Sequence, residues 1–86
     1  MYKLLIEKNA KKDLDNLELK ELKRIWIQIY QLGSEPRPKG SLKLKGSEND
    51  WRIRIGDFRV IYEINDEIKT VTIFGVKHRK EVYRKR

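Results

Sequence analysis

Three arginines, Arg52, Arg54 and Arg59, are the residues whose type and spacing best suggest a chemical role. They flank Gly56-Asp57, a two-residue hairpin signal with glycine where a type II′ turn needs a positive φ. Such a turn fixes the strand register, so Arg54 lies opposite Arg59 and Arg52 lies on the same face. Like charges directly opposite each other destabilise a strand pair by up to about 1 kcal/mol. A bound phosphate would explain the arrangement, because guanidinium groups match its oxygens bidentately.

The alternative is that these arginines are solvated charges on an open sheet face, partly balanced by Asp50 and Glu63. We favour the anion site, because a face that needed only solubility would mix the two signs of charge. In the same register the other side of the hairpin is wholly apolar, with the facing pairs Ile55 and Phe58, Ile53 and Val60, and Trp51 and Tyr62. That side is expected to be covered by helices.

Helical spacing predicts two consecutive helices before the hairpin. After a short strand over Tyr2 to Ile6, Asn9 is expected to N-cap a helix that Asp15-Asn16 ends. A longer helix follows, with apolar residues at steps of three and four, and Gly33 supplies its C-terminal stop. The two helices should pair along an apolar seam, and Trp26 is expected to lie in the core.

The second half of the chain predicts a loop followed by strands. Residues 34–49 contain two prolines and two glycines, so they form a long loop, which Leu42 and Leu44 would pin down. Period-two segments then predict three strands, over Trp51 to Ile55, Phe58 to Ile64 and Ile68 to Val76. The expected fold class is α+β: an N-terminal strand, a two-helix hairpin and an antiparallel three-strand meander, forming a four-stranded sheet with the helices on one face.

Length and composition restrict the class of protein further. Eighty-six residues allow a single domain over residues 1–86, and a net charge of +8 favours a polyanionic partner, leaving RNA, DNA, an anionic membrane or an acidic protein open. With no cysteine and one histidine, we expect no disulfide, no metal site and no small-molecule cofactor. No apolar run could span a membrane and no secretory signal is recognised, so a cytoplasmic protein without a membrane partner is expected.

Several segments together resemble the RelE and ParE superfamily of toxins. Trp51 to Tyr62 is similar to that family's central hairpin, Lys77 to Tyr83 to its C-terminal ending, and Pro36 to Pro38 with Leu42 to Gly46 to its middle loop. The order and spacing of these segments and the matching chain length extend the resemblance over nearly the whole chain. It implies a RelE-like α+β toxin that cuts mRNA, usually in the ribosomal A site, and is held silent by a cognate antitoxin.

The resemblance also implies site residues by position. Arg52, Arg54 and Arg59 match basic residues that hold the RNA backbone and stabilise the reacting phosphate. This chain departs from the family pattern by placing arginine at both Arg52 and Arg54, where lysine can occur. Because arginine cannot lose its proton in a protein, these groups are expected to act electrostatically and not as bases.

Proton transfer is therefore expected from residues near the C-terminus. RNA is cut without metal when its 2′-hydroxyl attacks the adjacent phosphate, which needs a proton acceptor, charge stabilisation and a proton donor. The resemblance matches Tyr83 to a C-terminal tyrosine and places His78 or Arg79 where a further catalytic basic residue is found. His78 or Tyr83 is the expected general base, with Lys77 a weaker candidate.

Two alternatives apply to these residues. His78 could instead be a surface imidazole at the end of the last strand, and Tyr83 could be an apolar anchor for the tail. If Asp66-Glu67 closes the second hairpin, Phe74 falls opposite Arg59 and His78 continues on the basic face, which favours the catalytic role.

Contacts to RNA or the ribosome are assigned to five further basic residues: Arg37, Lys43, Lys45, Lys77 and Lys80. The alternative for each is ordinary solvated charge. The resulting hypothesis is a metal-independent endoribonuclease toxin that acts on ribosome-bound mRNA. Its rivals are a toxin of the same fold that poisons DNA gyrase and a non-enzymatic RNA-binding module. Retention of His78 and Tyr83 beside the arginines favours the nuclease.

Overall fold

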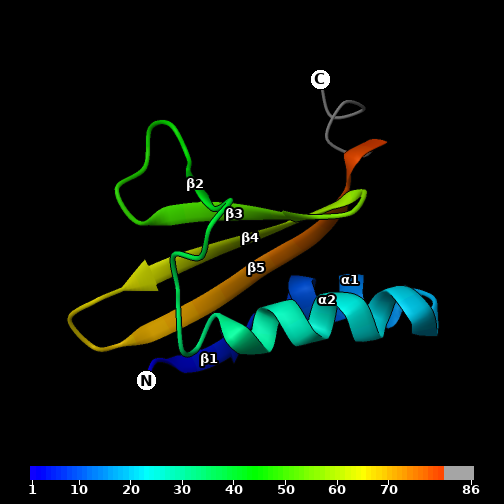
Figure 1. The fold of residues 1–86 in the computed structure, drawn as a ribbon, viewed down its shortest axis with the longest axis horizontal. Helices are drawn as coiled ribbons and strands as arrows, with labels where there is room; N and C mark the ends of the chain where they lie inside the picture. Colours follow the sequence, from blue (N-terminus) through cyan, green and yellow to red (C-terminus); the bar gives the residue numbers. More distant parts are fainter. Residues whose placement is uncertain (81–86) are drawn as a thin grey trace.

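The computed structural model describes residues 1–80 and contains two helices packed on one face of a mixed sheet (Figure 1). The elements in chain order are β1 (Lys3–Ile6), α1 (Lys8–Asp15), α2 (Leu19–Gln31), β2 (Leu42–Lys43), β3 (Asp50–Ile55), β4 (Phe58–Asn65) and β5 (Thr70–His78). The strand order is β1-β5-β4-β3-β2, with β1 parallel to β5 and the other neighbours antiparallel. The predicted α+β class is confirmed, and the short strand β2 adds a fifth strand to the four expected.

The helices differ from the prediction at one end and in one core residue. α1 begins at Lys8 with Glu7 as its extended N-cap residue, so the predicted N-cap at Asn9 is wrong, whereas the predicted end at Asp15 is confirmed. The prediction that Trp26 lies in the core is wrong, because this residue of α2 is 43% exposed. It lies beside the row of buried α2 residues formed by Ile25 and Ile29 and not within it. Within residues 1–80, neither helix is long and apolar enough to cross a membrane.

The core is a layer of apolar side chains between the helices and one face of the sheet. The helices contribute Ala10, Leu14, Ile25 and Ile29. The strands contribute Ile53, Ile55, Val60, Tyr62, Ile64, Val71, Ile73 and Val76. Because alternate strand residues point to opposite faces, the other face of the sheet is left open and carries the charged residues.

β3 and β4 pair in the predicted register. Gly56 has a φ of +61° at the turn, and Ile55 is paired with Phe58. The same register pairs Arg54 with Arg59, while Arg52 is paired with Ile61. The three arginines therefore share the open face of the sheet, as predicted.

The turn between β4 and β5 is longer than predicted. It spans four residues, 66–69, because the Asn65 side chain organises it: Oδ1 accepts hydrogen bonds from the backbone N–H groups of Glu67 (3.0 Å) and Ile68 (3.1 Å). Lys69 closes the turn with a φ of +58°. As a result β5 begins at Thr70, two residues later than predicted.

A β-bulge in β5 changes which side chains reach the open face. Tyr62 is paired with Ile73 and the preceding residue of β4 with Gly75, so Phe74 is the extra residue of the bulge. The prediction that Phe74 lies opposite Arg59 is therefore wrong. Lys77 occupies that position instead.

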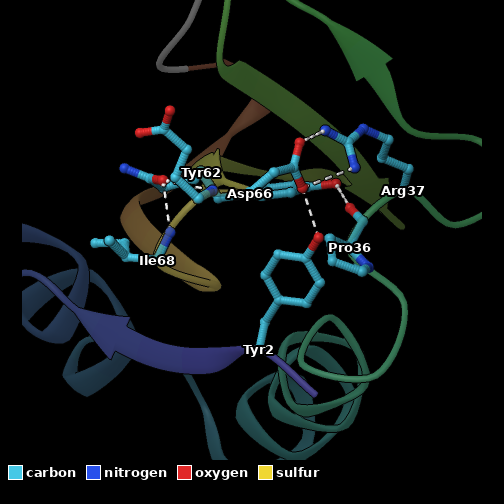
Figure 2. A network of polar contacts seen from close by, with 8 residues as sticks. Tyr2, Pro36, Arg37, Tyr62, Asp66 and Ile68 are labelled. Atoms are coloured by element: carbon cyan, nitrogen blue, oxygen red, sulfur yellow. Dashed lines mark hydrogen bonds and ion pairs between the residues drawn. The ribbon is translucent and has the colours of Figure 1, made fainter.

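The loop between α2 and β3 is held against the sheet by side-chain and backbone hydrogen bonds. The hydroxyl of Tyr62, inside the core, donates a hydrogen bond to the carbonyl oxygen of Pro36 at 2.7 Å (Figure 2). Further along the loop, β2 pairs Leu42 with Arg52. The Leu42 side chain itself is exposed, so this residue holds the loop by backbone pairing and not by entering the core.

Replacing Tyr62 with phenylalanine is expected to lower the free energy of unfolding by about 1–3 kcal/mol, because the Pro36 carbonyl loses its buried donor. Burial raises the pKa of Tyr62 to about 12, whereas an unfolded tyrosine ionises near pH ~10. Ionisation therefore favours the unfolded state as the pH rises from ~10 towards 12. Urea denaturation at pH 7 and pH 11 should show a smaller alkaline loss of stability in Tyr62→Phe than in the wild type. Equal stability of both proteins at pH 7 would argue against this anchor.

Candidate functional site: a basic row on the open face

Four basic side chains gather on the open face of the sheet. Arg54, Arg59 and Lys77 occupy directly paired positions on β3, β4 and β5, and we call these three residues the basic row. Arg52 lies two residues before Arg54 and therefore on the same face. Paired positions in neighbouring strands bring Cβ atoms to about 4.5–5.5 Å, so the four charges share a small area.

Arg59 and Arg54 lie close enough to Arg52 to affect its ionisation. Partial burial lowers the pKa of Arg52, and the positive charges of Arg59 and Arg54 lower it further. The Nε of Arg59 is buried and hydrogen-bonds to no atom of residues 1–80. Buried N–H groups normally have partners, because an unpaired one costs about 1–3 kcal/mol. The crowded arginines and the unpaired Nε of Arg59 therefore favour binding of an anion, because the oxygens of an anion accept hydrogen bonds and offset the positive charge.

Lys77 is held at one end of the basic row by a carboxylate from α1. Its Nζ lies 3.2 Å from Oδ2 and 3.4 Å from Oδ1 of Asp13. Lys77 is the member of the row that can transfer a proton, since arginine keeps its proton in proteins. The remaining carboxylates and His78 do not assemble a metal site within residues 1–80, where no three such side chains come together.

His78 lies on the opposite side of β5 from the basic row. It is paired with Phe58, whose ring it meets edge-on at a centroid distance of 5.1 Å and an interplanar angle of 87°. The prediction that His78 continues on the basic face is wrong, because the bulge reverses which residues of β5 face that side. The Nδ1 of His78 accepts a hydrogen bond from the N–H of Lys80 at 3.1 Å, so Nε2 carries the proton of the neutral ring.

Arg79 lies against the turn of the β3–β4 hairpin, close to the basic row. Its backbone N–H donates to the carbonyl oxygen of Asp57 at 2.8 Å, and its Nη1 lies 3.7 Å from a carboxylate oxygen of the same residue. Lys80 is exposed beside it. The predicted catalytic residue Tyr83 lies outside the described residues.

Arg37 takes part in a separate network with Asp66 (Figure 2). Asp66 directly follows the last residue of β4, so this network lies at the opposite end of β4 from the hairpin turn at Gly56. The Nη2 of Arg37 donates to Oδ2 of Asp66 at 2.8 Å, and its guanidinium carbon lies 5.3 Å from the ring centroid of Trp51. Asp66 also accepts a hydrogen bond from the hydroxyl of Tyr2. The hydrogen bond with Asp66 raises the pKa of Arg37, and the hydrogen bonds of Arg37 and Tyr2 lower that of Asp66. This ion pair joins the loop to the β4–β5 turn.

The other predicted RNA-contact residues do not join the basic row. Lys43 on β2 is paired with Trp51, which belongs to the helix-covered side, so its side chain leaves the sheet on that side. Lys45 is exposed in the loop that follows. Among the five residues assigned to RNA contact, the structure brings Lys77 into the basic row.

Sequence reasoning did not place Lys77 opposite Arg59 and did not pair it with Asp13. The first difference comes from the bulge, which moves Lys77 to the open face. The available signal was Gly75, because a glycine inside a strand pattern often marks a bulge. Asp13 lies 64 residues from Lys77 in the sequence, and no local pattern relates the two residues.

Comparison with known sequences places the chain in a family. The family model described as "ParE toxin of type II toxin-antitoxin system, parDE" matches residues 4–83. A protein from Methanocaldococcus jannaschii named putative toxin RelE1 is 33% identical over 86 residues, which cover 96% of each chain. Toxin RelG from Mycobacterium tuberculosis is 29% identical over 85 residues, which cover 98% of each chain.

Solved structures agree with the sequence relatives. A chain of the crystal structure of the archaeal RelE–RelB complex from Pyrococcus horikoshii matches with a TM-score of 0.81 and 32% identity, over 91% of this chain and 94% of that chain. The RelBE2 toxin–antitoxin complex from M. tuberculosis contains a chain that matches with a TM-score of 0.79 and 28% identity, over 90% of this chain and 96% of that one. The chain therefore belongs to the RelE/ParE toxin superfamily and is a RelE-type toxin of a toxin–antitoxin system.

Proposed function

We propose that this toxin is an endoribonuclease that cleaves mRNA in the ribosomal A site and thereby inhibits translation in the cytoplasm. The observation that carries the proposal is the basic row, in which two guanidinium groups and one ammonium group occupy directly paired positions. Such pairing costs stability when no anion is present. The cost is offset when the phosphate gains negative charge in a transition state, because preorganised cations stabilise that charge most.

In the proposed reaction the 2′-oxygen of the RNA attacks the adjacent phosphorus. The O2′–P bond forms and the P–O5′ bond breaks, while the 2′-hydroxyl loses a proton and O5′ gains one. The products are a 2′,3′-cyclic phosphate and a 5′-hydroxyl end. Arg54 and Arg59 stabilise the charge on the reacting phosphate, and Arg52 holds the neighbouring backbone. The cations of the protein supply the charge stabilisation, so the step requires no metal.

Proton transfer on the basic face is assigned to Lys77. A lysine side chain is protonated at neutral pH, so Lys77 serves as the donor to O5′. The acceptor for the 2′-hydroxyl proton is assigned to Tyr83, because His78 lies on the opposite side of β5 from the basic row. Arg79, next to the Asp57 turn, supplies a further contact to the backbone phosphates.

The exposed lysines outside the basic row are proposed to help the toxin bind the ribosome. Lys43, Lys45 and Lys80 add to a net charge of +8, which speeds association with ribosomal RNA through its phosphates. Arg37 would contact RNA only by weakening its ion pair with Asp66. We therefore expect Arg37 to contribute through the position of its loop.

A cognate antitoxin is the proposed protein partner. Relatives from P. horikoshii, M. tuberculosis and M. jannaschii were crystallised as RelE–RelB or RelBE complexes, at 28–32% identity to this chain. An antitoxin that covers or distorts the basic row would block access of RNA. Acidic antitoxin residues would then replace the phosphates as partners of the arginines.

One observation favours a second function, the poisoning of DNA gyrase, because the matching family model is named for ParE. A toxin that only binds gyrase has no need for a proton donor beside two guanidinium groups. The position of Lys77 in the basic row therefore favours the nuclease.

The proposed function is tested by adding purified toxin to ribosomes programmed with a defined mRNA. New 5′ ends are expected at A-site codons, with a 5′-hydroxyl group, and should be absent from naked mRNA. Inhibition of gyrase supercoiling while the mRNA stays intact would establish the second function instead. Protection of RNA without cleavage would indicate a non-enzymatic binding module.

A further inference from the structure

A carboxylate from α1 reaches the edge of the basic face and pairs with Lys77. Asp13 lies on the last turn of α1, and both of its carboxylate oxygens are within 3.4 Å of Nζ of Lys77. The side chains are 20% and 37% exposed, respectively, so the pair lies at the rim of the face. Nothing in the fold of the helix requires an acidic residue here, because a carboxylate near a helix C-terminus is unfavourable to the helix dipole.

Two features show that the carboxylate is held in place. The backbone N–H of Val76, on the edge of β5 beyond its pairing with β1, donates to Oδ2 of Asp13 at 2.9 Å. At position 75, an added Cβ would lie 3.3 Å from Cε of Lys77 and 3.4 Å from Oδ2 of Asp13. Glycine next to the bulge residue Phe74 therefore leaves the space that the ion pair occupies.

We propose that Asp13 is a positioning residue that holds the ammonium group of Lys77 at the basic row, ready to deliver its proton to the leaving oxygen. This inference rests on the proposed nuclease function. The lysine side chain carries its ammonium group on a flexible four-carbon stem, so an unrestrained ammonium group would sample many positions. A pair anchored to the backbone at Val76 limits that freedom, and a positioned proton donor acts far faster than a mobile one.

The matched test compares Asp13→Asn with Asp15→Asn. Asparagine at position 13 keeps an oxygen that accepts from the Val76 N–H but loses the charge that attracts Lys77. Asp15 is an exposed residue of the same helix. Its substitution therefore also removes one negative charge, but at a position that does not contact the basic row. Single-turnover cleavage of ribosome-bound mRNA should show about a tenfold lower rate constant in Asp13→Asn with KM little changed, because only orientation is lost. Asp15→Asn should retain the wild-type values.

A double-mutant cycle decides whether Asp13 acts through Lys77. In a Lys77→Met background, Asp13→Asn should cause no further loss of cleavage. A tenfold loss that persists in that background would overturn the proposal and assign Asp13 a role independent of Lys77.

A spectroscopic measurement separates this inference from the proposed function. The side-chain ammonium signal of Lys77 in ¹H–¹⁵N spectra, assigned by its loss in Lys77→Met, should be present in the wild type and in Asp15→Asn and shifted or absent in Asp13→Asn. An unchanged signal in Asp13→Asn would overturn the proposal even if the wild type cleaves mRNA. If the signal changes in Asp13→Asn but the wild-type toxin does not cleave mRNA, the pairing of Asp13 with Lys77 is supported and the nuclease function is rejected.

Discussion

Replacing Arg54 and Arg59 together with alanine is expected to reduce the rate of mRNA cleavage by at least about a thousandfold. The two residues are paired across β3 and β4, and in the proposed function both side chains contact the reacting phosphate. Removing one group that stabilises transition-state charge typically costs about 10²–10³ in kcat, and neighbouring groups are not additive. The expected result is a fall in kcat that exceeds any rise in KM.

The double variant should remain folded, which makes the experiment decisive. Removing a like-charge pair from directly opposite positions relieves a repulsion of up to about 1 kcal/mol, so its melting temperature should equal or exceed that of the wild type. The charge-matched control is Lys8→Ala with Lys12→Ala, which removes two exposed positive charges from α1. The control should cleave at close to the wild-type rate. Undiminished cleavage by a folded Arg54→Ala, Arg59→Ala protein would rule out the basic row as the active site.

The hairpin that carries these arginines could be predicted because its turn is local. Gly56-Asp57 allows a two-residue loop, and the alternation of apolar and charged residues on both sides fits a single register. The helices, the strands and the open face followed from similar periodicities. The short strand β2 was not predicted, since its pairing with β3 depends on backbone contacts of Leu42 and not on an apolar pattern.

The second hairpin could not be predicted from the same kind of signal. Its turn is organised by the side chain of Asn65, and its register then shifts at the bulge next to Gly75. An error of one residue in register moves every later side chain to the other face, which exchanged Lys77 for His78 on the basic face. The position of Trp26 outside the core has a similar origin, because helical spacing alone does not fix the width of the buried stripe.

The corrected register predicts that Lys77→Met lowers the rate constant for cleavage by about 10²–10⁴, the usual contribution of a general acid. Lys77→Arg should be nearly as impaired, because arginine keeps the charge but does not give up its proton. KM should change little in Lys77→Arg, since the basic row keeps its charge for binding. Lys12→Met, on the exposed side of α1, is the control and should retain wild-type activity.

A substrate with sulfur in place of the bridging 5′-oxygen identifies the step at which Lys77 acts. A thiolate leaves without being protonated, because a thiol is far more acidic than an alcohol, with a pKa of about 8.5 in cysteine. Lys77→Met and the wild type should therefore cleave this substrate at similar rates, whereas Arg54→Ala with Arg59→Ala should remain impaired. An equally large defect of Lys77→Met on both substrates would show that Lys77 does not protonate the leaving oxygen. A larger loss in His78→Gln than in Lys77→Met on the natural substrate would return the main proton-transfer role to the histidine.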